Sequence, residues 1–469
     1  MIKIYNTETK SKENFSSLKP NSVKIYQCGP TVYWYQHIGN MRAAFIGDIV
    51  FRSFIFEKYQ VNFVRNFTDV GHLTGDNLGD ADQGEDRMEK ASKREDLSPQ
   101  EIAQKYTDAY KKDISLLNIL EPTQSPSATE EIYEIKKMVK NLLKKGFAYE
   151  TDLAIYFDTG KAKNYTRLSG QNIEENLKGS GHGDVEDSQK KKHSDFALWI
   201  FKKGKHANAL QTWKSPKKSF FEKKPNGFPG WHIECSAMIK RYLGPTIDIH
   251  LGGIEHIPTH HTNEIAQSEA ANEVDFVKYW MHYEHLLADN KKMAKSEGTG
   301  YLLSEIIEKG FDPLTLRFFF LQAHYRSKQN FTWEALEAAQ NGLNKLRKDV
   351  SSLPDSKVKA DKNFINKFKE KLFDDFNTPQ ALSVVYDILN SNLEDKVKKA
   401  TILEIDKVLG LDLNKAQKVN IPTEVTSLVN EREEARKSQD WAKSDELREK
   451  IESLGFKVKD TANGQEVIN

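Results

Sequence analysis

The alternation of apolar and polar residues predicts where the first strands and helices lie. Residues 22–27 (SVKIYQ) alternate polar and apolar positions, which is typical of a β-strand, and a Cys-Gly-Pro sequence ends the pattern. After Asn40, apolar residues at helical spacing predict a helix, and residues 61–67 (VNFVRNF) predict a second strand. Strand, helix and strand in this order indicate a parallel βαβ unit, and therefore a doubly wound parallel sheet.

A second strand and helix follow much later in the chain. Residues 247–250 predict a strand, a Gly-Gly loop comes next, and a helix is expected from about Thr262. Between these two strand–helix patterns, at about residues 120–225, the pattern of apolar and polar residues changes. A Ser-x-x-Glu capping box at Ser127 predicts a helix there that Gly146 ends. This segment is therefore expected to be an insertion into the sheet domain.

Residues after about 305 carry almost wholly helical patterns. Apolar residues recur every four positions from Phe364 to Phe376, and weak alternation over 456–468 suggests a small hairpin. The expected fold is α/β, with a Rossmann-type doubly wound sheet domain, an insertion, an all-α helical bundle and a small C-terminal domain. The expected parts are 1–119 and 226–290 for the two halves of the sheet domain, 120–225 for the insertion, 291–345 for a junction, 346–414 for the bundle and 415–469 for the C-terminal domain.

Composition and charge narrow the class of protein. In 469 residues, 69 Lys and Arg nearly balance 68 Asp and Glu, so the net charge of +1 excludes a uniformly basic nucleic-acid coat. No apolar run approaches the roughly 18 residues of a membrane helix, and the N-terminal residues lack the apolar stretch of a signal peptide. With only Cys28 and Cys235, no disulfide framework is expected. We expect a soluble cytoplasmic protein without a membrane segment.

The first candidate site is the segment 28–40 (CGPTVYWYQHIGN), between the first strand and its helix. In an α/β sheet this is the crevice where ligands bind, and a helix N-terminus favours phosphate. His37 is suited to donate to a phosphate oxygen, Gly39 to let a nucleotide approach the backbone, and Asn40 to offer an amide donor. The alternative is an ordinary loop with a capping asparagine, because so short a match also arises by chance.

The second candidate is the loop 288–300 (ADNKKMAKSEGTG). Lys292 and Lys295, flanked by small and polar residues that include Ser296, suit a loop that closes over a polyphosphate and stabilises the charge on a departing pyrophosphate. The alternative is a solvated lysine loop, which is the commoner fate of such pairs.

The third candidate combines the two cysteines with a helical His–Glu pair. Cys235 lies in GWHIEC, and His260 follows 25 residues later with Glu264 at i+4, on the same helix face. With distant Cys28 these residues make a set of zinc ligand types. The alternative is two buried apolar cysteines and a structural His–Glu pair. Four further histidines compete as ligands, and spacing alone does not exclude them: His232, His250, His256 and His261.

Five motifs, in this order, resemble those of the cysteinyl-tRNA synthetases, a family of class I aminoacyl-tRNA synthetases: CGPTVYWYQHIGNMR, GWHIECSAM, HHTNEIAQSEA, KMAKS and DDFNTPQAL. The resemblance runs from about residue 2 to the end and includes residues 430–464. Five ordered motifs are far more specific than any one of them. The chain departs from the family pattern at Asn40, where His is usual, and at Ala294, where Ser is usual.

Position by position, the resemblance implies roles for the candidate residues. It assigns His37, Gly39 and Asn40 to a first nucleotide signature, Lys292, Lys295 and Ser296 to a second, Cys28, Cys235, His260 and Glu264 to one zinc ion, and Trp231, His250 and Thr68 to the amino acid pocket. It also implies a monomer, and places anticodon binding in the C-terminal region.

The implied activity is ATP-dependent activation of L-cysteine, then transfer to the terminal adenosine of tRNA(Cys), with Mg²⁺ accompanying ATP. His37 and Asn40 would stabilise the α-phosphate, and Lys292 and Lys295 the pyrophosphate. Zinc would separate cysteine from serine, because exchanging one group in an ordinary pocket is worth only about 1–3 kcal/mol. A soft metal binds sulfur much better than an alcohol.

The helical C-terminal half is expected to bind tRNA, with Trp441 either stacking on an unpaired anticodon base or packing in a core. Two other functions are weighed against this one. A ligase that joins cysteine to an amino sugar would share the zinc and both signatures, but needs no anticodon-binding domain. A catalytically silent tRNA-binding paralogue has no need of both lysines and all four metal ligands.

Overall fold

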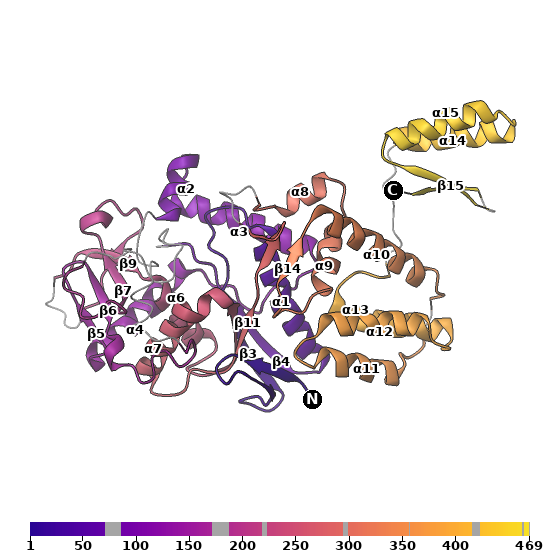
Figure 1. Ribbon diagram of the computed structural model, residues 1–469. Coiled ribbons are helices and arrows are strands. Elements are labelled where there is room, and N and C mark those ends of the chain that lie inside the picture. Colours follow the sequence, from indigo (N-terminus) through magenta and orange to yellow (C-terminus); the bar gives the residue numbers. More distant parts are fainter. Residues whose placement is uncertain are drawn as a thin grey trace. The chain divides into compact units, whose positions relative to one another are not determined.

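The computed structural model describes residues 1–70, 86–170, 187–217, 223–293, 299–355, 357–414, 423–461 and 464–468 (Figure 1). The chain divides into two compact units. The first contains Met1–Leu343 and Leu353–Asp412, and the second contains Asn344–Ser352 and Leu413–Asn469. Among the described helices, none is both long and apolar enough to cross a membrane.

A four-stranded parallel sheet organises the first unit. Its order is β11-β10-β3-β4, with β3 at Ser22–Gln27, β4 at Gln60–Arg65, β10 at Ile247–Gly253 and β11 at Val277–Tyr283. All neighbouring pairs are parallel. The helix α1 (Ile38–Phe56) connects β3 to β4, so the predicted βαβ unit and the α/β fold class are confirmed. Every residue of β10 is buried, as expected for an inner strand of a parallel sheet.

The chain after β10 is bent by glycine and by an irregular helical turn. Two short turns, η4 (Ile254–His256) and the π-helical η5 (Ile257–His261), lead into α7 (Thr262–Asn272). A Cβ atom at Gly252 would lie 2.3 Å from Cε1 of His261, so only glycine lets this ring pack against the strand. A π-helical turn adds a residue to the helix and often marks a functional site. Here it brings two consecutive histidines inside the protein.

The segment between β4 and α6 (Trp231–Tyr242) contains a second sheet. Its antiparallel sheet has the order β5-β6-β7-β9-β8. The predicted capping box of Ser127 begins the short turn η1 (Ala128–Glu131), and α4 follows it to Gly146, which has φ 77°. The elements are α2 (Arg87–Glu95), α3 (Pro99–Leu116), α4 (Ile132–Lys145), β5 (Ala148–Glu150), β6 (Ala154–Phe157), η2 (Thr159–Lys161), β7 (Phe196–Phe201), η3 (Gly204–His206), β8 (Trp213–Lys214) and β9 (Asn226–Pro229).

After about residue 305 the described part of the first unit is helical, as predicted, except for one short strand. The strand β14 (Gln329–Phe331) pairs in parallel with β12 (Leu286–Ala288), which also pairs with β13 (Lys291–Lys292). This pairing joins segments 40 residues apart and leaves no local signal in the sequence. The remaining elements are the hairpin β1 (Lys3–Asn6) and β2 (Ser11–Asn14), and the helices α8 (Leu303–Glu308), α9 (Pro313–Leu321), α10 (Trp333–Ser351), α11 (Lys362–Leu372), α12 (Thr378–Leu389) and α13 (Asp395–Leu409). The part of α10 from Asn344 onward belongs to the second unit.

The predicted four-residue repeat ends earlier than expected. Phe376 lies beyond α11, in a turn where Asp375 and Phe376 both have positive φ. In the second unit, α14 (Thr423–Lys437) and α15 (Trp441–Ser453) form a helical pair. A hairpin follows, β15 (Lys457–Thr461) with β16 (Gly464–Ile468), which confirms the predicted hairpin.

A buried cluster of charged side chains links α1 to other helices of the first unit. Asp48 is 0% exposed and lies 2.6 Å from an Arg317 nitrogen and 2.9 Å from an Arg52 nitrogen. The two guanidinium groups also donate to backbone carbonyls near the C-terminal ends of α3 and α13, including Asn118 O and Leu409 O. The negative ends of these helix dipoles and one carboxylate thus balance two buried cations.

Asp48→Asn is expected to destabilise the protein by about 3–5 kcal/mol, because it leaves two buried cations without a balancing charge. A shift of the urea unfolding midpoint measures this. As a control, Glu404→Gln removes the partner of Lys407, whose exposed pair with Glu404 on α13 should change stability by less than about 1 kcal/mol. Equal effects of the two substitutions would contradict the assigned role of the cluster.

Candidate active site

The candidate residues gather at the carboxyl ends of the parallel strands. Cys28 follows β3, Thr68 lies three residues after β4, and His250 lies within β10. His282 lies in β11, directly opposite Gly252 of β10. In an open α/β sheet this edge is where ligands bind.

Four potential metal ligands converge there: Cys28, Cys235, His260 and Glu264. One donor atom of each lies within 4.8 Å of all the others. Cys235 comes from α6, and His260 and Glu264 come from η5 and α7. All but half-buried Cys28 are at most 1% exposed. The structure therefore brings together the donors that were assigned to zinc from three remote segments.

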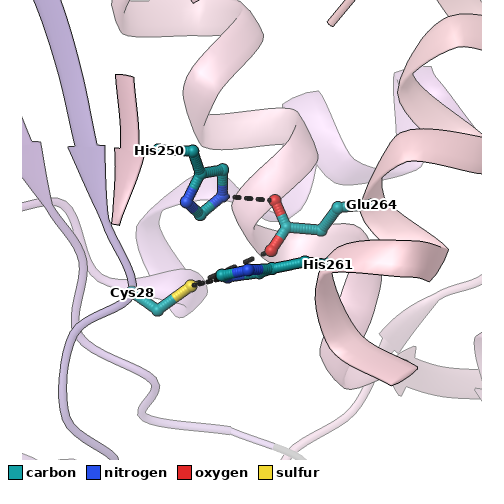
Figure 2. Close-up of side chains that lie close together, drawn as sticks. All are labelled: Cys28, His250, His261 and Glu264. Atoms are coloured by element: carbon teal, nitrogen blue, oxygen red, sulfur yellow. Dashed lines mark hydrogen bonds and ion pairs between the residues drawn. The ribbon is translucent and has the colours of Figure 1, made fainter. Parts of the chain in front are cut away.

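A second set of donors overlaps the first. Cys28 and Glu264 also lie within 4.8 Å of donor atoms of His250 and His261 (Figure 2). His250 Nε2 is 2.9 Å from Glu264 Oε2, and Cys28 Sγ is 3.4 Å from His261 Nε2. Carboxylates and imidazoles that bind the direct ligands commonly fix their orientation at metal sites.

His260 is oriented as a metal ligand would be. Its Nδ1 shares a hydrogen bond of 3.0 Å with Nδ1 of His232. Its Nε2 lies 2.8 Å from Glu264 Oε1 but makes no hydrogen bond of acceptable geometry, although it is buried. With the proton on Nδ1, the Nε2 lone pair and the carboxylate oxygen face the same small space as the two sulfurs. The donor set and this unpaired atom both fit Zn²⁺.

Mutual interactions shift the pKa values of the four groups. The hydrogen bond from Cys28 lowers the pKa of Cys235 to about 6, whereas burial raises that of Cys28. Burial alone would raise the pKa of Glu264. The attraction of His250 and His260 for the carboxylate is stronger than this effect and lowers the pKa to about 2. Burial alone would lower the pKa of His260. The negative charge of Glu264 has the larger effect and raises the pKa to about 10. These shifts favour a second proton on His260 beside the anionic sulfur and carboxylate, and a metal ion bound to Nε2 would take the place of that proton.

Further aromatic side chains enclose the cluster. Trp231 stacks on His260 with ring centroids 4.2 Å apart. His261 Nδ1 is 2.7 Å from His282 Nε2, and His282 Nδ1 is 2.7 Å from the Thr7 hydroxyl. Burial lowers the pKa of both His261 and His282, which favours neutral rings. Sequence reasoning missed His282, because only the pairing of β11 with β10 brings this residue to the site.

Thr68 is held in a buried hydrogen-bond chain. Its hydroxyl donates to Glu234 Oε2 at 3.3 Å and accepts from Asn66 Nδ2 at 3.3 Å. Asn66 Oδ1 in turn accepts from the backbone N–H of Gly29. Burial raises the pKa of Glu234. Glu234 was another residue that sequence reasoning missed, because nothing in a single sequence shows that a helical glutamate faces inward.

A cavity of about 210 Å³ lies at the start of α1. It is lined by His37, Gly39, Asn40, Arg42, Ala43, Glu255, Tyr283, Glu284, His285, Leu286 and Met293. His37 is the N-cap residue of α1, and its Nδ1 accepts from Gly39 N at 3.1 Å. A neutral His37 therefore carries its proton on Nε2, which makes that nitrogen a hydrogen-bond donor. The positive end of the helix dipole adds to the attraction for phosphate.

If this cavity binds ATP, as the resemblance implies, Gly39→Ala is expected to lower the rate of the ATP-dependent reaction without destabilising the protein. A Cβ atom at this position would lie 2.9 Å from Nδ1 and Cε1 of His37, so the ring must move. A misplacement of about 1 Å costs on the order of 100-fold in rate. Alanine also favours helix by up to about 1 kcal/mol, so the melting temperature should hold or rise. Rates within twofold of the parent would contradict this role of His37.

The second predicted signature is described only in part. The backbone of Lys292 lies in β13, opposite Leu287, and Met293 lines the cavity. This places the beginning of the lysine loop beside the first signature. Lys295 and Ser296 lie outside the described residues.

Three family models match parts of the chain. Residues 14–341 match a family model described as the class I (C) tRNA synthetase catalytic domain, 367–414 match a DALR domain, and 419–467 match a cysteinyl-tRNA ligase anticodon binding domain. The chain is 40% identical to cysteine–tRNA ligase 1 of Burkholderia lata over 473 residues, covering 100% of this chain and 97% of the relative.

Two further matches extend the comparison. The chain is 39% identical to cysteine–tRNA ligase of Chlorobaculum tepidum, covering 99% of this chain and 98% of the relative. Among solved structures, methionyl-tRNA synthetase of Mycobacterium tuberculosis bound by methionyl-adenylate has a TM-score of 0.55 at 13% identity, covering 83% of this chain and 90% of the other. That last likeness concerns the fold alone.

Proposed function

This chain belongs to the cysteine–tRNA ligases, a family of class I aminoacyl-tRNA synthetases with ATP, cysteine and tRNA as substrates, and from this premise we propose how its residues carry out the reaction. The supporting observation is that four zinc-type donors converge on the strand ends that also border the His37 cavity. We further propose that the chain charges tRNA(Cys), works as a monomer in the cytoplasm, and is divided into the six parts given above.

One zinc ion would be held by Cys28, Cys235, His260 and Glu264. When bound, it would supply a soft Lewis-acid site that prefers the substrate's sulfur to the hydroxyl of serine. His250, hydrogen-bonded to Glu264, holds that carboxylate in place, and Trp231 stacked on His260 restricts the imidazole. His250 and Trp231 would also form walls of the amino acid pocket, with Thr68 beside it.

Activation of cysteine requires its carboxylate to attack the α-phosphate of ATP in line, so that the bond to pyrophosphate breaks. His37 Nε2–H and the Asn40 amide would donate to oxygens of the α-phosphate, and Gly39 leaves the backbone open to the nucleotide. Lys292, Lys295 and Ser296 would bind the departing pyrophosphate, and the Mg²⁺ that accompanies ATP would supply further positive charge to the phosphates. Such a reaction depends on positioning and charge neutralisation more than on covalent catalysis.

Recognition of tRNA would extend to the second unit. Trp441, at the start of α15, is 56% exposed, and the Arg436 guanidinium lies 5.7 Å from the centre of its ring. An exposed indole beside a guanidinium suits stacking on an unpaired base. This exposure favours the stacking role over the core-packing alternative.

Two coupled assays test the proposed function. ATP–pyrophosphate exchange should depend on cysteine and should be weak with serine, and charging should then require tRNA(Cys). Exchange without charging of any tRNA would point to the amino-sugar ligase, and failure of both would point to the silent paralogue. Charging of a tRNA with a replaced anticodon at undiminished efficiency would contradict the role of the second unit.

A further inference from the structure

We propose that Asp375 is a positioning residue for the nucleotide cavity and acts on it through the turn at residues 324–327 and through Arg42. Asp375 lies between α11 and α12, and the 324–327 turn lies between α9 and β14. All of these residues belong to the first unit. The proposal rests on the proposed function in one respect, because it takes the cavity that His37 lines as the ATP site.

The buried carboxylate of Asp375 joins the 324–327 turn to the N-terminal strand. Its side chain is 0% exposed. Oδ1 accepts from the Tyr325 hydroxyl at 2.7 Å and from the backbone N–H of Tyr5, in β1, at 2.9 Å. Oδ2 accepts from Arg326 Nε at 2.8 Å. One carboxylate therefore holds two consecutive side chains of the turn and one strand.

The backbone of Asp375 makes a third contact with the turn. Nδ1 of His324 accepts from the backbone N–H of Arg326 at 3.2 Å, so the neutral ring carries its proton on Nε2 and donates to the Asp375 carbonyl at 2.9 Å. Asp375 has a φ of 67°, a left-handed conformation that aspartate and asparagine tolerate better than most residues with a side chain. Three consecutive side chains of the turn thus contact one residue.

The backbone carbonyls of the same turn orient Arg42. The Arg42 guanidinium donates to the carbonyls of Ser327 at 2.9 Å and His324 at 3.3 Å. It also donates to the carbonyl of Glu284, the residue after β11. The backbone N–H of Glu284 in turn donates to the Tyr325 carbonyl at 3.0 Å. The turn therefore positions both Arg42 and Glu284, and both line the cavity of about 210 Å³ at the start of α1.

Arg42 brings a positive charge to this cavity. It is 2% exposed, and among the residues that the structure describes its partners are backbone carbonyls, not carboxylates. Burial lowers the pKa of Arg42 to about 10, so the guanidinium stays charged near neutral pH. A buried cation held by carbonyl dipoles keeps its full charge for a phosphate anion, and its attraction depends on its distance from that anion. A shift of the turn would therefore change the binding of ATP.

Asp375→Asn tests the proposal with a readout that a purely structural role would not move. Asparagine has nearly the same size and tolerates the positive φ, but its amide nitrogen cannot accept from Arg326. The KM for ATP in cysteine-dependent pyrophosphate exchange should rise by about fivefold, as for residues that act on a site through intervening contacts. The kcat and the KM for cysteine should stay within about twofold. Mere loss of folded protein would lower kcat and leave the KM for ATP unchanged.

The neighbouring carboxylate provides a matched control. The side chain of Asp374 is 43% exposed and pairs with Lys12 at 2.9 Å. Asp374→Asn should leave the KM for ATP within about twofold, since exposed ion pairs contribute little. Arg326→Met breaks the contact with Asp375 from its more exposed side, and should raise the KM for ATP even if Asp375→Asn does not fold.

A double-mutant cycle tests whether Asp375 acts through Arg42. Arg42→Lys keeps the charge but loses the fork of donors, and it should itself raise the KM for ATP. Adding Asp375→Asn to Arg42→Lys should raise this KM by less than about twofold more, because both changes disturb the same contact. Effects that multiply in the double variant would overturn the proposal.

Three further outcomes would also overturn it: an unchanged KM for ATP in both Asp375→Asn and Arg326→Met, a fall in kcat alone, or an equal rise in KM in Asp374→Asn. These outcomes are distinct from failure of the proposed function. If the parent protein shows no cysteine-dependent exchange, the proposed function fails and this proposal with it. If the parent catalyses exchange and the variants keep its KM for ATP, only the role of Asp375 is refuted.

Discussion

Cys28→Ser is expected to abolish stoichiometric zinc and to lower kcat/KM for cysteine activation by about a thousandfold or more. Loss of a partner that merely supports a ligand costs about 10–100-fold in metal affinity or activity, so loss of a direct ligand should cost more. Cys28 also links both donor sets, since its sulfur lies near Cys235, Glu264 and His261. Serine keeps the size of the side chain but replaces a soft thiolate by an alcohol.

Zinc content by mass spectrometry and pyrophosphate exchange with cysteine and with serine measure the effect. Cys235→Ser should behave in the same way, because its sulfur belongs to the same group of ligands. Glu273→Gln, at the exposed end of the helix that carries Glu264, should retain both zinc and activity. One zinc per chain and a normal KM for cysteine in Cys28→Ser would refute the metal assignment.

Lys295→Ala is expected to lower the rate of pyrophosphate exchange by about 10²–10³-fold, comparable to the loss of one donor that stabilises developing charge. Its loop follows β13, and Met293, the next residue after this strand, lines the same cavity as His37 and Asn40. Because the lysine acts on charge that grows as pyrophosphate departs, the effect should fall on kcat more than on the KM for cysteine.

A lysine in the same segment provides the control. Lys291 is exposed in β13 and directly precedes the signature, so Lys291→Ala removes the same charge from the same loop. Lys291→Ala should change the exchange rate by no more than about threefold, because a solvent-exposed charge that does not touch the phosphates is screened by salt. An unchanged rate in Lys295→Ala, or an equal loss in Lys291→Ala, would refute the specific role of Lys295.

Local patterns predicted much of the fold because they act over short stretches of chain. The alternation in residues 22–27 and the apolar spacing after Asn40 correspond to β3 and α1. The strand β14 was missed, because its three residues gain their partners only from β12, some 40 residues away. Phe376 was placed on a helix by its spacing, yet the chain turns at Asp375 with positive φ.

The residues of the candidate site were likewise predictable only in part. The i, i+4 spacing of His260 and Glu264 follows from helical geometry, and the ordered motifs pointed to Cys28 and Cys235. The inward-facing supports were not visible in one sequence. His282, for example, belongs to the site only because β11 lies parallel to β10, with His282 opposite Gly252.

The sequence by itself determined the donor types, their local spacing and the family, because these depend on neighbouring residues and on the order of motifs. Only the tertiary structure decided which side chains meet. Cys28 and Glu264 are 236 residues apart, yet their donor atoms lie 3.8 Å from each other. Asp48 and Arg317 form a buried pair across a similar separation. Such contacts depend on how the sheet and the helices pack as a whole, and that packing is a property of the entire chain.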